Sequence, residues 1–144
     1  MNKTITCKTL TLEAAKSLIN SAINKARELG VGGAIAVVDS GGHLICLERI
    51  DGTMVAAANI AIGKAATAVG FKRPGHVLET AVTEKRTVMG TLIGIPPAPF
   101  VPLMGAYPIL EDNVVVGGIA VAGAENGEND EIIVLHALKQ FNAL

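Results

Sequence analysis

The chain has 144 residues, of which 50% are hydrophobic, 17% charged and only 3% aromatic, and its formal net charge is −1. Scattered basic residues in a near-neutral chain offer no surface to a polyanion, so the composition excludes nucleic acid as an expected partner. The length predicts a single domain over residues 1–144. The mean hydropathy of +0.47 is high for a small monomer, so we expect a homo-oligomer, either a dimer or a larger assembly.

The N-terminal residues, the cysteines and one uncharged segment bear on the location of the protein. Residues 1–11 are polar, and Cys7 and Cys46 form no disulfide framework, so we expect a cytoplasmic protein. Residues 87–110 carry no charge over a length that could cross a membrane. They contain five prolines, which a spanning helix would not tolerate: Pro96, Pro97, Pro99, Pro102 and Pro108. This segment is therefore predicted to be a buried, extended connector, with no membrane association.

The first predicted element is a helix that begins after Thr11 and ends at Gly30. Its apolar residues recur at helical spacing, Thr11 is a good N-cap, and Gly30 is a good stop. The continuous apolar run 34–38 predicts a buried strand. The Asp-Ser-Gly-Gly turn at 39–42 returns the chain into a second strand at 43–50, which makes a β-hairpin.

Two further helices are predicted in the middle of the chain. The first runs from about Met54 to Val69 and is apolar nearly all round, which is typical of a buried helix. The second begins at Pro74, since proline is favoured in the first turn of a helix. Its expected core positions are Val77, Leu78, Ala81, Val82, Val88 and Met89.

The last third of the chain predicts two strands, 106–110 and 114–121, joined by a turn at Asp112 and Asn113. Gly117 and Gly118 inside the second strand predict the close approach of another backbone or helix. Asn129 is the expected N-cap of a final helix that ends near Phe141. This order of elements indicates the α+β class, with helices on both faces of an antiparallel sheet.

The three histidines are the candidate metal or haem-iron ligands. Each lies on a different predicted element, without the spacing of a metal site, so an isolated and partly exposed side chain is the ordinary interpretation. His76, near a helix start after Pro74, is the first candidate for a ligand to haem iron, and His43, beside the glycine turn, is the second. His136 lies among apolar neighbours in the last predicted helix.

Lys64 is the lone charge in a helix that is otherwise uncharged. Burial of an ammonium without a partner is costly, so we expect a carboxylate beside it. One interpretation is a structural partner, either Asp39 or Asp51, or a side chain that reaches solvent. The other is a cation that binds the carboxylate of a ligand, with Arg49 and Arg73 as further cations of the same site.

Tyr107 and the acidic segment 125–131 are two further candidates for a site. Tyr107 follows Gly105 and precedes a proline, and an aromatic ring with a polar tip in that setting lines a pocket or belongs to the core. The acidic segment 125–131 is predicted to be a solvated loop and a helix cap rather than a cation site. Nucleophile, phosphate-loop and zinc motifs are missing from the sequence.

Several blocks occur together in an order that resembles the GlcG/HbpS family, which includes haem-binding proteins and the C-terminal domain of PduO. These blocks are Val37–Leu44, Glu48–Gly52, Gly63–Ala68, Phe71–Pro74, Gly105–Ile109, Val116–Val121 and Asp130–Glu131. The resemblance implies a profilin-like three-layer α/β/α fold with an antiparallel sheet of about five strands, assembled into dimers or rings. It also implies haem as one candidate ligand, and a link to the utilisation of glycolate, diols or glycerol. Tyr107 departs from the family pattern, which commonly has a small residue at that position.

The residues and the resemblance together favour a cytoplasmic homo-oligomer that binds a carboxylate-bearing small molecule, with haem as one candidate. The expected site lies near the helix 54–69 and the segment 105–108, and its candidate residues are Arg49, Asp51, Lys64, Arg73, His76, Gly105 and Tyr107. One alternative is an enzyme for a small hydroxy-acid or aldehyde, with Lys64 as an acid/base or Schiff-base amine. The other is an interaction module without a small ligand.

Overall fold

The computed structural model describes residues 1–94 and 99–144. Its elements, in chain order, are α1 (Leu12–Leu29), β1 (Ala34–Asp39), β2 (Leu44–Arg49), α2 (Ala57–Phe71), α3 (Gly75–Thr80), the π-helical turn η1 (Ala81–Lys85), the 3₁₀ helix η2 (Thr87–Gly94), β3 (Ala106–Glu111), β4 (Val114–Ala122) and α4 (Gly127–Asn142). The predicted α+β class is confirmed.

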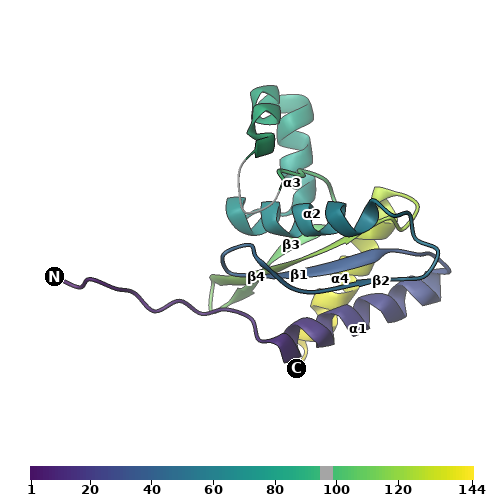
Figure 1. Ribbon diagram of the computed structural model, residues 1–144, viewed down its shortest axis with the longest axis horizontal. Helices are drawn as coiled ribbons and strands as arrows, with labels where there is room; N and C mark the ends of the chain where they lie inside the picture. Colours follow the sequence, from purple (N-terminus) through teal and green to yellow (C-terminus); the bar gives the residue numbers. More distant parts are fainter. Residues whose placement is uncertain (95–98) are drawn as a thin grey trace.

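The strands form one antiparallel sheet in the order β2-β1-β4-β3. Helices α1 and α4 cover one face and α2 covers the other (Figure 1). Within the described residues the sheet has four strands, so the expected number of about five is too high. Because β1 and β4 are central and covered on both faces, nearly all their residues are buried.

Helix α1 is the element that local sequence determines most directly. Thr11 Oγ1 accepts a hydrogen bond from the Ala14 amide at 3.1 Å, and Gly30 ends the helix with a left-handed φ of 70°. Its buried residues form the predicted apolar stripe against the sheet: Ala15, Leu18, Ile19, Ala22, Ile23 and Ala26.

The β1–β2 hairpin is also confirmed. Asp39 Oδ1 accepts hydrogen bonds from the amides of Gly41 and His43, at 2.8 and 3.0 Å, and so fixes the turn. The predicted close approach at the glycine pair is confirmed in β4. A Cβ on Gly118 would lie 2.6 Å from Val69 Cγ2 of α2, so only glycine lets this helix pack so near the sheet.

The chain after Pro74 differs from the prediction. Helix α3 is short and is followed by η1 and η2, and together these elements (residues 75–94) form an arm that projects from the body (Figure 1). Of the expected core positions Leu78 is buried, but Val77 is 40% exposed and Val88 is 63% exposed. Residues 87–94 of the expected extended connector are helical and mostly exposed, and residues 95–98 lie outside the described residues.

Helix α4 begins three residues earlier than predicted. Its N-cap is Asn126, whose Oδ1 accepts a hydrogen bond from the Asn129 amide at 2.8 Å. The Asn129 side chain instead donates to the Ala124 carbonyl at 3.0 Å. This earlier start moves Asp130 and Glu131 from the predicted first two positions of the helix to its fourth and fifth residues. No helix in the described residues is long and apolar enough to cross a membrane.

Candidate ligand-binding site

Lys64 lies in the middle of α2 and is only 2% exposed. Its Nζ donates to Asp130 Oδ2 at 3.0 Å and to the Val121 carbonyl at 2.6 Å. The expected carboxylate partner is therefore present, but it is Asp130 of α4 rather than Asp39 or Asp51. Among the described residues these two acceptors are the hydrogen-bond partners of Nζ, which leaves the third ammonium N–H for a ligand.

Burial disfavours the charged forms of both Lys64 and Asp130. It lowers the pKa of Lys64, while the attraction of Asp130 opposes that shift. Burial likewise raises the pKa of Asp130, and the Lys64 ammonium and the Ala124 amide oppose it. Both shifts favour the neutral forms, so the transfer of a proton from Nζ to Oδ2 costs less here than it would in water.

Gly105 lies against this pair at the start of β3. Its φ is 88°, and a Cβ at this position would lie 2.5 Å from Asp130 Cβ and 3.0 Å from Lys64 Nζ. Its backbone is held at both ends, because its amide donates to Glu131 Oε2 at 2.6 Å and its carbonyl accepts from the Val121 amide at 2.9 Å. Only glycine fits this position.

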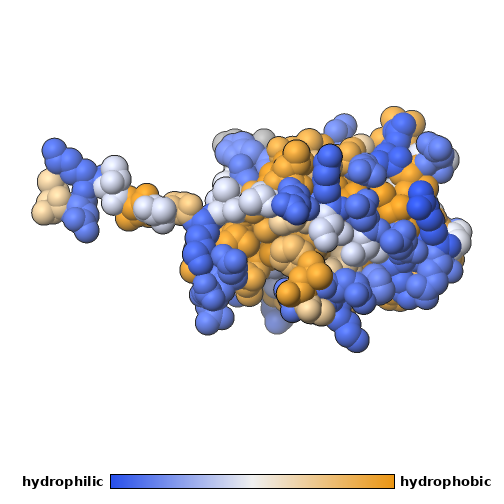
Figure 2. Space-filling model, turned by 90° about the horizontal axis from the view of Figure 1, so that it is seen from below, coloured by the Kyte–Doolittle hydropathy of each residue, from blue (hydrophilic) through white to orange (hydrophobic). Residues whose placement is uncertain are grey.

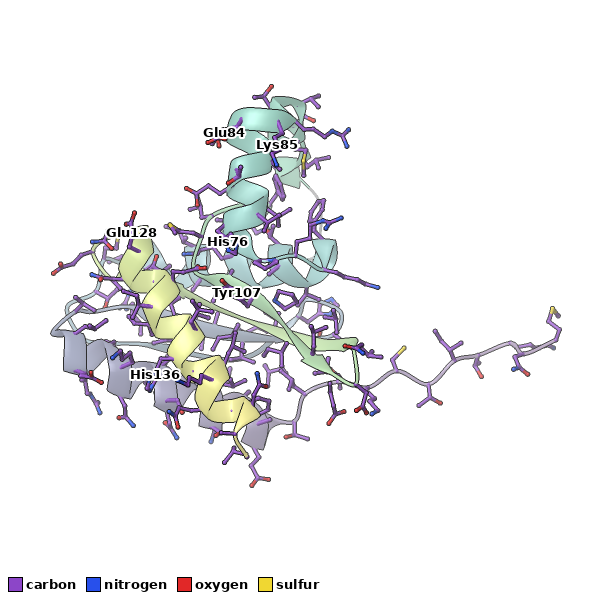
Figure 3. All side chains as sticks on the ribbon, turned by 180° about the vertical axis from the view of Figure 1, so that it is seen from behind. His76, Glu84, Lys85, Tyr107, Glu128 and His136 are labelled. Atoms are coloured by element: carbon purple, nitrogen blue, oxygen red, sulfur yellow. The ribbon has the colours of Figure 1, made fainter. Side chains whose placement is uncertain are left out.

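A second polar cluster lies on the other side of Gly105, where Glu131 meets Tyr107 and His76. The Tyr107 hydroxyl donates to Glu131 Oε1 at 2.5 Å, and His76 Nδ1 lies 3.2 Å from the same oxygen. Burial and the Glu131 carboxylate raise the pKa of Tyr107. His76 and Tyr107 lie side by side below the arm (Figure 3). With 45% of its side chain exposed, His76 can offer Nε2 to a ligand.

Lys64 and Asp130 line a cavity of about 620 Å³ that opens beside α4. Its wall contains three further carboxylates, from Glu79, Glu125 and Glu128, together with apolar groups that include Met104. Glu79 Oε2 accepts a hydrogen bond from the Met104 amide at 2.6 Å. The cavity is acidic, so Lys64 is not the unpaired cation for a ligand carboxylate that one interpretation of the sequence assumed.

The structure brings some of the predicted site residues together and separates others. Lys64, Gly105, Tyr107 and His76 lie in one region, linked through Asp130 and Glu131 near the start of α4. The remaining predicted residues lie elsewhere. Arg49 and Asp51 line a different cavity of about 360 Å³ beside α1, Arg73 is exposed at the end of α2, His43 is exposed near Asp39, and His136 lies on α4 away from His76 (Figure 3).

Sequence reasoning missed the three carboxylates that organise this region: Glu79, Asp130 and Glu131. The acidic segment 125–131 was predicted to be solvated, but Asp130 is 7% exposed and Glu131 is half-buried. One signal was available, since Asp130 and Glu131 form one of the blocks that resemble the family. Nothing in the sequence marked Glu79 as a site residue.

Comparison with known proteins decides the family. A family model described as "Haem degrading protein HbpS-like" matches residues 10–139. The chain belongs to the GlcG/HbpS family. GlcG of Escherichia coli is 32% identical over 114 residues, which cover 78% of this chain and 81% of GlcG. A Citrobacter freundii protein, described as an uncharacterized 15.0 kDa protein in the dhaT-dhaS intergenic region, is 30% identical over the full length of both chains.

Solved structures of relatives agree with this assignment. The Klebsiella pneumoniae protein ORFY superposes with a TM-score of 0.91 at 29% identity, covering 100% of this chain and 98% of ORFY. The complex of PduOC with haem superposes with a TM-score of 0.82 at 25% identity, covering 91% of this chain and 94% of PduOC. Haem binding therefore occurs in a relative with this fold.

Proposed function

We propose that this GlcG/HbpS-family chain is a cytoplasmic, homo-oligomeric binding protein whose ligand is haem, a carboxylate-bearing small molecule. The observation that carries the proposal is the contact of His76 Nδ1 with Glu131 Oε1 at 3.2 Å. His76 Nδ1 also lies within hydrogen-bond distance of the Tyr107 hydroxyl, at 3.4 Å, and that hydroxyl donates to Glu131. A carboxylate and a hydroxyl beside Nδ1 orient the imidazole and strengthen Nε2 as a metal ligand. His76 Nε2 would be the atom that holds the iron of a bound haem, and the haem would supply that iron centre.

The residues around His76 fit a haem group at the surface. Tyr107 donates to the same Glu131 oxygen and lies with its ring centroid 5.9 Å from that of His76, so it restricts the movement of the imidazole. Lys72 and Arg73 are exposed at the end of α2, a few residues before His76 in the chain. Their charges suit the haem propionates, whereas the acidic wall around Lys64 does not.

Titration of haemin into the protein tests the assignment of the iron ligand. We expect a Soret band distinct from that of free haemin in the wild type, and its loss or shift in His76→Ala. The matched controls His43→Ala and His136→Ala should keep the wild-type spectrum, because neither residue lies near the Glu131 cluster. Identical spectra for the wild type and all three variants would contradict ligation by His76.

Exposed apolar side chains on two surfaces support the homo-oligomer. On the arm, Val88 is 63% and Ile93 is 69% exposed, a cost that burial against another copy would remove. The face formed by α1 and α4 also carries hydrophobic patches between hydrophilic groups (Figure 2). Its exposed residues include Ile132 and Leu135, each at 45%.

Light scattering at micromolar concentration tests the assembly. We expect a mass that is a multiple of the 14.8 kDa chain. The substitution Val88→Glu on the arm should lower the mass, because a charge in an apolar interface is costly. Glu84→Gln, also on the arm, is the matched control for a surface substitution that adds no charge (Figure 3). A wild-type mass equal to that of one chain would contradict the oligomer.

A further inference from the structure

The cavity beside Lys64 has a chemistry of its own, separate from the surface around His76. Its charged wall holds one ammonium, from Lys64, and four carboxylates, from Glu79, Glu125, Glu128 and Asp130. An anionic ligand would be repelled by this wall. Hydroxyl groups, in contrast, can donate to the carboxylates without adding charge to the cavity.

The position of Lys64 in this wall is unusual for a purely structural ion pair. A buried pair that only joins α2 to α4 needs close packing around it, since each unfilled volume costs stability. Here the pair adjoins about 620 Å³ of space. In addition, Nζ has one N–H beyond those that bind Asp130 and Val121 among the described residues.

Asp130 is placed to take up the proton that would make Lys64 a nucleophile. Its Oδ2 lies 3.0 Å from Nζ, and burial favours the neutral form of each group. Transfer of one proton converts the ammonium–carboxylate pair into an amine and a carboxylic acid. The total charge of the cavity is unchanged, and two buried charges are removed.

We propose that Lys64 Nζ forms a reversible Schiff base with a small, uncharged hydroxyaldehyde that enters this cavity. This inference goes beyond haem binding and does not depend on it. The amine attacks the carbonyl carbon to form a C–N bond, and the carbonyl oxygen takes the proton held by Asp130. The resulting carbinolamine then loses its hydroxyl group, with a proton, as water and leaves the imine. One amine and one aldehyde thus give one imine and one water.

Reductive trapping tests this chemistry in the wild-type protein. Glycolaldehyde and cyanoborohydride are added at neutral pH, and peptide mapping by mass spectrometry gives the fraction of each lysine modified. An imine at Lys64 becomes a stable secondary amine. Because burial lowers the pKa of Lys64, a larger share of this lysine is neutral amine, so we expect Lys64 to be labelled severalfold more than exposed Lys16 of α1.

Glyoxylate is the matched probe, because it carries a carboxylate where glycolaldehyde carries a hydroxymethyl group. The labelling ratio of Lys64 to Lys16 should fall severalfold with glyoxylate, and division by Lys16 cancels the intrinsic reactivity of each aldehyde. In urea the ratio should approach one with both probes. Labelling of Lys16 but not Lys64, or an equal ratio with both probes in the folded protein, would overturn the proposal. Neither result bears on the Soret titration.

Discussion

Removal of the Lys64 ammonium is the sharpest test of how α2 is joined to α4. The substitution Lys64→Met keeps most of the side-chain volume. It leaves Asp130, whose side chain is 10% exposed, as a buried carboxylate without a cation, and it leaves the Val121 carbonyl without its donor. The packing of the helix changes little, so the loss of stability reports mainly on these two polar groups.

The expected loss is large. Breaking one side of a buried ion pair costs about 3–5 kcal/mol, of which an unsatisfied carbonyl accounts for about 1–3 kcal/mol. For a chain of this length the melting temperature should fall by roughly 10 °C or more. The double variant Lys64→Met/Asp130→Asn should recover more than half of that loss. It removes the stranded charge, while the Asn oxygen can still accept the Ala124 amide, as Asp130 Oδ1 does at 3.0 Å.

Urea unfolding followed by circular dichroism measures these differences. All variants must be compared at one protein concentration, because an oligomer gains stability with concentration. Lys16→Met on the exposed face of α1 is the matched control, and we expect it to change the unfolding free energy by no more than about 0.5 kcal/mol. If Lys64→Met unfolds at the same urea concentration as this control, the buried pair does not hold the two helices together.

Three further results are expected from the same assay. Because burial lowers the pKa of Lys64 below 10.5, the unfolded chain binds more protons at this residue in the alkaline range. The wild type should therefore gain stability relative to the Lys64→Met/Asp130→Asn variant as the pH rises toward 10.5, and a flat difference would contradict the shift. Gly105→Ala should cost about 2 kcal/mol or more through its positive φ and its collision with Asp130, whereas Gly90→Ala, with open space around it, should cost about 0.5 kcal/mol or less. Asn126→Ala should lose about 1 kcal/mol with the cap of α4, and no loss would restore Asn129 as the cap.

The parts of the fold that were predicted correctly depend on interactions between near neighbours in the chain. Helix α1 has a capping threonine, an apolar stripe and a terminal glycine within one segment. The β1–β2 hairpin has its turn residues between two apolar runs, and the Asp39 carboxylate that fixes the turn is itself part of the turn. In both cases all the residues that determine the element lie within one short segment, so the prediction required no knowledge of the rest of the fold.

The arm was mispredicted because the spacing of its apolar residues does not identify the surface that they contact. Val77 and Val88 occur in a helical pattern that is typical of a core-facing helix, but in the structure they lie on a projection of the chain. Hydrophobic periodicity indicates that a face will be covered, and it does not specify by what. Contact with another copy of the chain, as in the proposed oligomer, would satisfy the same pattern as contact with the sheet.

The sequence predicted only some residues of the candidate site, for a related reason. Lys64 was marked by its contrast with the apolar residues around it, and the need for a carboxylate followed from the cost of burying an ammonium. Its partner lies 66 positions away, so no spacing rule could select Asp130 over Asp39 or Asp51. Glu79 was hidden because the acceptor role of its carboxylate toward Met104 becomes apparent only after folding.

Two adjacent carboxylates in α4 determine what each side of the site can bind. Asp130 turns toward Lys64 and the cavity, whereas Glu131 turns toward Tyr107 and His76 at the surface. Gly105 contacts both residues. Its amide donates a hydrogen bond to Glu131, and its lack of a side chain leaves room for Asp130. The lysine and the histidine alone suggest one cationic pocket for an anion. With their carboxylates included, the histidine fits its proposed role as an oriented metal ligand, and the lysine fits its proposed role as an amine that Asp130 can neutralise in an acidic cavity.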